Sequence, residues 1–249
     1  MPEGPTPDPA VQKVRIRYAK RGRMRFTSTR DFQRALERAV RRAGLPVAYS
    51  AGFHPHPKIS YANAAPTGTA SEAEYVEVSL TRVVDPSSLV GPLDAALPDG
   101  LDVLDVSDSA DLPGPLADHL EGSLWSMRFR GGAAQGGEVR REDLRAAVAA
   151  LLAAPELHVS RMMKKGPREL DVRAALLGLD LAPEPVPGEG GSGDVVLLAT
   201  LRHTTPTVRP EEVWTALRQV SGLDLPRPVP TRLRQGPVRD GEVCELLGG

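Results

Sequence analysis

Two histidines, a lysine and an aromatic ring lie close together in the segment 49–75, the most unusual stretch of the chain. Its central part reads GFHPHPK at 52–58. Proline fixes φ and removes an amide donor, so the alternating prolines are expected to hold the backbone extended and to point both imidazoles to similar sides. Imidazole and amine groups on a stiff segment can bind a metal ion, exchange protons or donate hydrogen bonds to an anion.

Four interpretations of this segment remain open from the residues alone. His54 and His56 could form a metal pair, although no HExxH motif or clustered carboxylate accompanies them. One histidine could be the general base of a metal-free RNA cleavage through the 2′-OH, although no acid partner is visible. His54, His56 and Lys58 could donate to a phosphate or base edge, with Phe53 or Tyr49 as a stacking surface. Finally, the prolines and histidines could build a rigid turn packed under a helix.

The charge distribution favours a polyanionic partner. Residues 11–60 contain thirteen Lys and Arg against two acids, an excess of +11, and residues 61–130 contain three bases against twelve acids, an excess of −9. The net charge of −1 therefore hides two regions of opposite sign. A basic field of this size attracts polyanions, nucleic acid first among them. The alternative is a solvated charged face that the acidic stretch neutralises.

Length and composition limit the classes of protein. A chain of 249 residues can form one large domain or two small ones. No apolar run is long enough to span a membrane, and the proline-rich N-terminus lacks a secretion signal pattern. The single cysteine, Cys244, excludes an intrachain disulfide, a cysteine-ligated Fe–S cluster and a cysteine zinc finger. A cytoplasmic protein without a cofactor is expected.

The first half predicts the element order β-α-β-β-α-β. Residues 13–19 alternate apolar and basic residues, which indicates a half-buried strand with a basic outer face, and 24–26 is expected to continue it or to form a hairpin arm. Ser28, three residues before Asp31, predicts a helix start, and Gly44 predicts the helix end. The remaining expected elements are strands at 58–62, 73–81 and 101–108 and a helix at 85–97.

The second half runs in a similar order. The patterns predict a strand at 123–131, a helix at 141–153, a hairpin of 157–162 and 169–182 around Lys164-Lys165-Gly166, a strand at 194–204, a helix at 210–220 and a strand at 230–238. We therefore expect an α+β protein of two tandem ferredoxin-like (βαββαβ) modules. The expected domains are a disordered tail at 1–11, a basic module at 12–108, a linker at 109–122, a second module at 123–238 with a flexible insertion at 183–194, and a tail at 239–249.

Two groups of basic residues are candidates for contact with phosphates. In the first half, Arg30, Arg34, Arg38 and Arg41 recur at helical spacing and form a second stripe beside the apolar face of the predicted helix. In the second half, several bases surround the tip of the predicted hairpin, which could lie along a phosphate backbone or be a solubilising loop. The complete predicted interface is Arg15, Arg17, Arg25, Arg30, Arg34, Arg38, Arg41, Phe53, His54, His56, Lys58, Arg161, Lys164, Lys165, Arg168 and Arg173.

The segment 24–78, MRFTSTRDFQRALERAVRRAGLPVAYSAGFHPHPKISYANAAPTGTASEAEYVEV, closely resembles the DUF2344, or radical SAM-linked, family. The resemblance covers most of 12–235, and Lys165, Arg168, Asp171 and Arg173 fit the family's second half. Members of this family occur alone or attached to the C-terminus of a radical SAM, cobalamin-binding protein, so the resemblance implies one of these two contexts. Since this chain lacks a three-cysteine motif, a radical SAM enzyme would be a partner in trans. The family often has His where this chain has Thr29, which argues against catalysis by that histidine.

We therefore expect a non-catalytic, RNA-binding accessory protein that assists the maturation or modification of tRNA or rRNA alongside a radical SAM enzyme. One alternative is a metal-independent endoribonuclease, because tandem ferredoxin-like folds with basic surfaces host such enzymes. Another is a protein-interaction module whose basic face docks an acidic partner.

Overall fold

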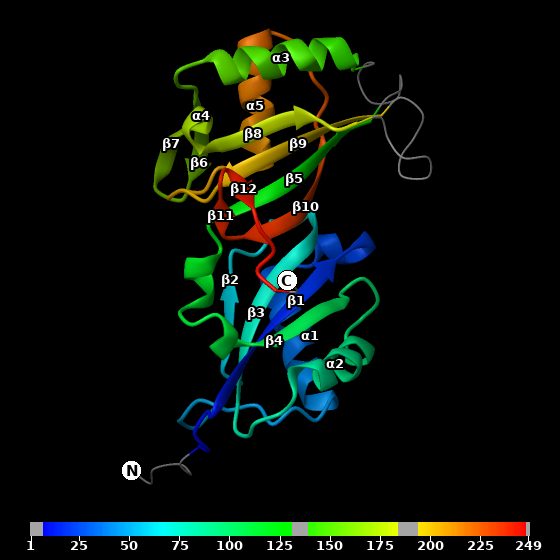
Figure 1. Cartoon of the computed structure of the whole chain (residues 1–249), viewed down its shortest axis with the longest axis vertical. Helices are drawn as coiled ribbons and strands as arrows, with labels where there is room; N and C mark the ends of the chain where they lie inside the picture. Colours follow the sequence, from blue (N-terminus) through cyan, green and yellow to red (C-terminus); the bar gives the residue numbers. More distant parts are fainter. Residues whose placement is uncertain (1–6, 131–138, 184–193, 248–249) are drawn as a thin grey trace. The chain divides into compact units, whose positions relative to one another are not determined.

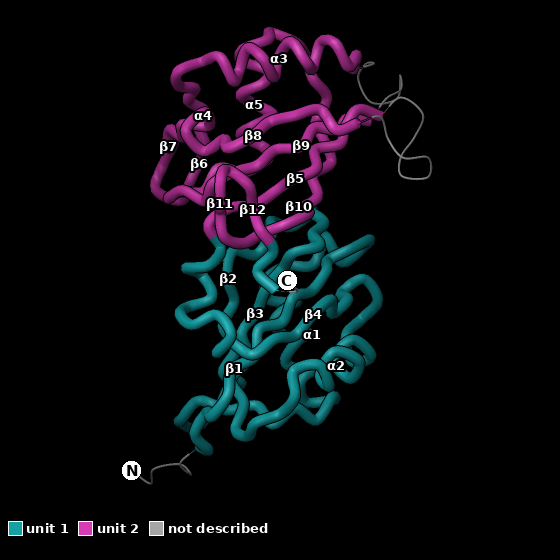
Figure 2. Tube along the Cα trace, viewed as in Figure 1, with its two compact units in different colours: residues 1–120, 245–249 teal, residues 121–244 magenta. Residues whose placement is uncertain are grey.

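The computed structural model describes residues 7–130, 139–183 and 194–247. The chain folds into two compact units, Met1–Leu120 with Glu245–Gly249 and Glu121–Cys244 (Figure 2). Both units combine helices and strands, so the α+β class is confirmed. Most of the predicted N-terminal tail and of the predicted insertion at 183–194 lies outside the described residues. Within the described residues, no helix has the length and apolar character needed to cross a membrane.

Unit 1 contains a four-stranded antiparallel sheet with the two α-helices, α1 and α2, on one face (Figure 1). The strand order is β4-β1-β3-β2. Its core joins Phe32, Leu36 and Val40 of the first helix to Ile16 and Val76 of the sheet. The elements are β1 Gln12–Lys20, the 3-10 helix η1 Gly22–Phe26, α1 Thr29–Arg42, β2 Ile59–Ala62, β3 Ala70–Leu80, η2 Pro86–Leu89, α2 Val90–Ala96, β4 Val103–Asp108, η3 Ser109–Asp111 and η4 Leu116–His119.

Local signals set the two ends of α1. The Ser28 Oγ accepts a hydrogen bond from the Asp31 backbone N at 3.2 Å, which confirms the predicted helix start. Gly44 has a φ of +67°, the left-handed conformation that ends helices and that glycine adopts without strain. The prediction of a strand or hairpin arm at 24–26 is wrong, because these residues belong to η1.

The opposite face of the unit 1 sheet is covered by segments that were predicted to be a linker and a tail. Tyr75 points away from the helices, since successive strand residues alternate faces, and it packs with Leu116, Leu120, Leu246 and Leu247. Both predictions are therefore wrong for Leu116, Leu120, Leu246 and Leu247, because these apolar side chains pack with Tyr75 in a small second core.

Unit 2 has the strand order β10-β5-β9-β8, with antiparallel neighbours. The helices α3 and α5 pack on it, and among the described strands β6 and β7 form a separate two-stranded hairpin. The predicted single segment at 169–182 is divided among β7, α4 and β8, so that prediction is wrong. The elements are β5 Gly122–Phe129, α3 Arg141–Ala153, β6 His158–Met163, β7 Gly166–Asp171, α4 Val172–Ala175, β8 Leu176–Leu181, β9 Val195–Arg202, α5 Pro210–Ser221, β10 Val229–Gly236, β11 Val238–Arg239 and β12 Glu242–Val243.

Candidate functional site

Arg15 on β1 is buried, so the prediction that it contributes to a binding surface is wrong. Its side chain is 1% exposed. The Nε donates to Glu77 Oε2 at 3.1 Å, and the two terminal nitrogens donate to the carbonyl oxygens of Leu112 and Gly114 at 2.7 and 2.5 Å. Glu77 lies directly opposite Arg15 in the β1–β3 register, and the chain that covers this face supplies the carbonyls. Arg15 is therefore a structural cation.

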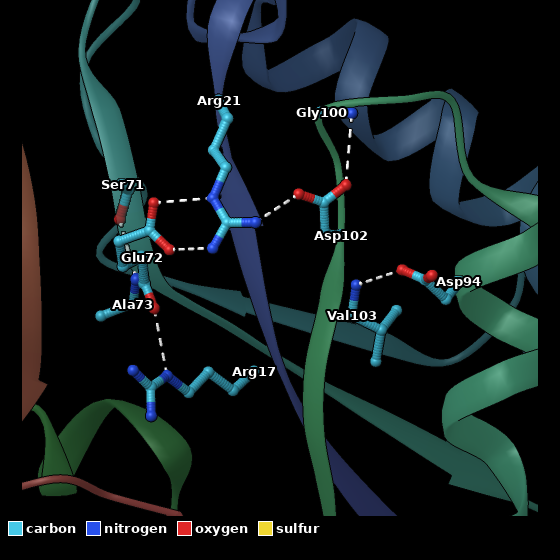
Figure 3. Close-up of polar contacts among 9 residues, drawn as sticks. All are labelled: Arg17, Arg21, Ser71, Glu72, Ala73, Asp94, Gly100, Asp102 and Val103. Atoms are coloured by element: carbon cyan, nitrogen blue, oxygen red, sulfur yellow. Dashed lines mark hydrogen bonds and ion pairs between the residues drawn. The ribbon is translucent and has the colours of Figure 1, made fainter. Parts of the chain in front are cut away.

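Other bases on or next to β1 are also bound to acidic partners (Figure 3). Arg17 donates from Nε to the Glu72 carbonyl at 3.0 Å and forms an ion pair with Glu245 at 2.8 Å. Arg21 donates hydrogen bonds from Nε and Nη2 to the two carboxylate oxygens of Glu72, and from Nη1 to Asp102 Oδ2 at 2.6 Å. Hydrogen bonds to Glu72, together with the charges of Glu72 and Asp102, raise the pKa of the Arg21 guanidinium against the opposing effect of burial. The acidic stretch thus neutralises much of the basic strand.

The arginine stripe, defined as Arg30, Arg34, Arg38 and Arg41, behaves differently. All four side chains are exposed on α1, and none makes a hydrogen bond or ion pair with a described residue. The first three are spaced at i, i+4 and i+8, where like charges destabilise a helix by about 0.2–0.5 kcal/mol per pair. Arg30 also lies in the first turn, where the helix dipole disfavours a cation. Asp31 and Glu37 lie three residues from Arg34 and offset part of this repulsion, but all four guanidinium groups stay available to an external anion.

The histidine loop, defined as residues 50–58, is closed by backbone groups. The Ser50 N donates to the His56 carbonyl at 2.9 Å, and the His56 N donates to Ser50 Oγ at 3.0 Å. The chain bends at 51–54, so the prediction of an extended backbone is wrong for this part. Phe53 is 77% exposed, and the side chains of His54, His56 and Lys58 are exposed as well. The imidazoles are not packed under the helix, which removes the purely structural interpretation of both histidines.

The bases of the lysine hairpin, defined as β6, β7 and their turn, and Arg173 of the adjoining α4 have two different roles. Arg161 donates to the Thr207 carbonyl at 3.1 Å and pairs with the buried Glu212 at 3.2 Å, and Arg173 donates to the Leu152 carbonyl near the end of α3 at 3.2 Å. These two predicted ligands are therefore used within unit 2. The bases left exposed, without a contact to a described residue, are Lys164, Lys165 and Arg168.

The sequence pattern did not single out Phe26, which adjoins the arginine stripe. The ring is 59% exposed, and the Arg25 guanidinium carbon lies 4.6 Å from its centroid. A cation over an aromatic face is a weak attractive contact. Arg25 Nε is buried and has no hydrogen-bond partner within the described part of the chain. A bulky apolar residue at an exposed position could have revealed this surface, but residues 24–26 also fit a strand pattern and were interpreted in that way.

A small polar hollow opens beside the first turn of α1, and sequence analysis missed it as well. Lys20, Ser28, Phe32, Tyr61 and Glu74 are among its lining residues, and its volume of about 20 Å³ suits a water-sized group. The Tyr61 hydroxyl is buried without a partner among the described residues. Burial, and then the charge of Glu37, raise the pKa of the Tyr61 hydroxyl. The sequence signal that was missed is a charged residue at a position where the strand pattern calls for an apolar one: Lys20 on β1 and Glu74 on β3.

A family model described as an uncharacterized protein conserved in bacteria, DUF2344, matches residues 13–210. The chain belongs to the DUF2344 family. The matched segment contains the arginine stripe, the histidine loop and the lysine hairpin. No curated protein matches the chain by sequence. The association of this DUF2344 chain with a radical SAM enzyme stays a prediction.

Metal chemistry receives no support from the described part of the DUF2344 chain. It contains no group of three or more His, Cys, Asp or Glu side chains placed to hold a metal ion. His119 contacts the Pro113 carbonyl at 3.0 Å, and His203 contacts Ser123 Oγ at 2.6 Å, so neither joins His54 and His56. The exposed groups can bind an anion, and the buried charged groups maintain the fold.

Proposed function

We propose that this DUF2344 protein binds RNA through unit 1 and does not itself act on the RNA chemically. The observation that carries the proposal is the arginine stripe: four exposed guanidinium groups on one helix that have no partner in the described part of the chain. Helical rise places Arg30 and Arg41 about 16 Å apart along the axis, so the stripe can follow several phosphates. Arginine suits this role because its planar fork binds phosphate oxygens in pairs.

The histidine loop adds donors near the end of the stripe. Only Ala43–Pro46 separate α1 from Val47, which bridges to Leu80, opposite the start of β1. The exposed His54, His56 and Lys58 can donate to phosphates or base edges there. The RNA species we propose are tRNA or rRNA, with an RNA-modifying radical SAM enzyme as the partner in trans that the family resemblance suggests.

We also propose that each unit is a ferredoxin-like module. The strand orders β4-β1-β3-β2 and β10-β5-β9-β8 support this, because each follows the pattern 4-1-3-2 with one helix after the first strand and one after the third. In unit 2 the lysine hairpin is then an insertion between the first helix and the second strand.

The test is binding of labelled total RNA to the full-length protein in EDTA. Retention of intact RNA supports the proposal. Cleavage would favour the endoribonuclease alternative, and neither retention nor cleavage would favour a protein that docks an acidic partner. The informative variant replaces Arg34, Arg38 and Arg41 by Gln. Its matched control replaces Arg82, Arg145 and Arg239 by Gln, because these arginines are exposed elsewhere and the charge change is the same.

A further inference from the structure

The two exposed phenylalanines stand apart in a chain with few aromatic residues. The sequence contains four Phe. Phe32 and Phe129 are buried, at 6% and 0% exposure, whereas Phe26 and Phe53 expose more than half of their surface. Ordinary packing does not explain why half of the phenylalanines of a folded protein face water, since exposed rings forgo the stabilisation of burial.

The two rings lie at opposite ends of α1. Phe26 is the last residue of η1, directly before the helix. Phe53 belongs to the histidine loop, which leaves the sheet beside the start of β1, and Figure 1 shows this loop at the end of unit 1 where α1 finishes. The helix between them is about 21 Å long and carries the arginine stripe. The arginine stripe thus lies between the two segments that carry the exposed rings.

This combination matches the chemistry of single strands. Proteins that bind single-stranded nucleic acid combine a cationic groove along the backbone with aromatic rings on which unstacked bases lie. A duplex keeps its bases stacked inside, so it could use the arginines but not the rings. Arg25 lies on one face of Phe26, which leaves the remaining surface of the ring for a base and adds a cation next to it.

We propose that the RNA bound by unit 1 is single-stranded, with bases stacked on Phe26 and Phe53 and the intervening phosphates on the arginine stripe. The inference rests on the proposed function, because it names the class of RNA that the same surface selects. It also assigns a role to Phe26.

The test uses the full-length protein and a labelled 20-nucleotide RNA without self-complementarity, either alone or annealed to its complement. The wild-type protein should bind the single strand at least about tenfold more tightly than the duplex. The Phe26→Leu/Phe53→Leu protein should lose that preference and keep its duplex affinity, because leucine is apolar but offers no flat ring. Equal binding of both RNAs by the wild-type protein, or an unchanged preference in the variant, would overturn the inference and leave RNA binding intact.

Fluorine NMR of protein labelled with 4-fluorophenylalanine gives a second readout that does not depend on affinity. The single strand should shift two of the four signals, those assigned to Phe26 and Phe53 by the Leu variants, while the buried Phe32 and Phe129 serve as internal controls. Shifts confined to other signals would contradict stacking at these rings. If neither RNA binds at all, the proposed function fails together with the inference.

Discussion

At the scale of single residues, the arginines of unit 1 divide by what their guanidinium groups contact. Arg15, Arg17 and Arg21 bind internal carboxylates and carbonyls, whereas Arg34 and Arg38 face water without a partner among the described residues. The same side chain therefore has a structural role on the sheet and an available charge on the helix. Substitutions should separate these roles. Replacing an internally bound arginine of the sheet should change stability, and replacing an exposed arginine of α1 should change binding.

Replacing Arg15 by Met should lower the free energy of unfolding by about 3–5 kcal/mol, because the buried Glu77 loses one of its two cationic partners and the carbonyls of Leu112 and Gly114 lose their donors. Lys13 remains 3.1 Å from Glu77 and can recover part of the loss. Urea unfolding measures the change, with Arg38→Met as the exposed control, expected within about 0.5 kcal/mol of the wild type. A loss below about 1 kcal/mol for Arg15→Met would show that the buried pair contributes little.

Tyr75 predicts a pH dependence of stability. Burial, opposed by the charge of Arg17, raises the pKa of Tyr75 to about 12, compared with about 10 in an unfolded chain. Its contribution is complete below pH 10 and is lost as the pH rises from 10 to 12, because only the unfolded state releases the proton. Over that range Tyr75→Phe should lose less stability than the wild type, by about 1.4 kcal/mol per pH unit. Parallel urea curves at pH 9, 10 and 11 check this, and identical pH slopes would contradict it.

At the scale of elements, α1 carries repulsion that a charge reversal relieves. Arg38→Glu places an acid between Arg34 and Arg42 and turns two repulsive i, i+4 pairs into attractive ones, and no acid lies three or four residues from position 38. The variant should be more stable at low salt by about 1 kcal/mol and should nevertheless bind RNA more weakly. Thermal unfolding at low and high salt, with RNA titration, measures both effects. A destabilised variant would show that Arg38 contributes to the fold.

The histidine loop should keep its shape without its imidazoles. The contacts that close it come from Ser50 and from the backbone of His56, so His54→Ala with His56→Ala should leave Tm within about 2 °C of the wild type. The same variant should lose selectivity among RNAs, because donors to base edges are removed. A large fall in Tm would instead make the histidines structural.

Local sequence signals predicted α1 well, and long-range packing limited the rest. Ser28 and Gly44 act within one helical turn, so both ends of the helix could be predicted. The burial of Arg15 depends on carbonyls at 112 and 114, about a hundred residues away, and no periodicity reports such a contact. The same holds for Leu116 and Leu246. Their segments have the composition of a linker and a tail, and their burial depends on a contact with Tyr75 that is distant in sequence.

At the scale of the whole molecule, a net charge of −1 conceals a specific division of charge. The acids of β3 and the following segments neutralise bases of β1 within unit 1, and the described cations left without a partner include those of α1, the histidine loop and the lysine hairpin. The exposed bases of the hairpin, Lys164, Lys165 and Arg168, are a second cationic surface on unit 2. Overall charge alone would have predicted no affinity for a polyanion.

The salt dependence of RNA affinity tests the central claim most directly. Each phosphate neutralised by a cation releases counterions, and the logarithm of the binding constant falls with the logarithm of the salt concentration in proportion to the number of contacts. For a single-stranded RNA, replacing Arg34, Arg38 and Arg41 by Gln should reduce this slope by about 2. The control that replaces Arg82, Arg145 and Arg239 should keep the wild-type slope. Equal slopes for all three proteins would contradict RNA binding by the arginine stripe.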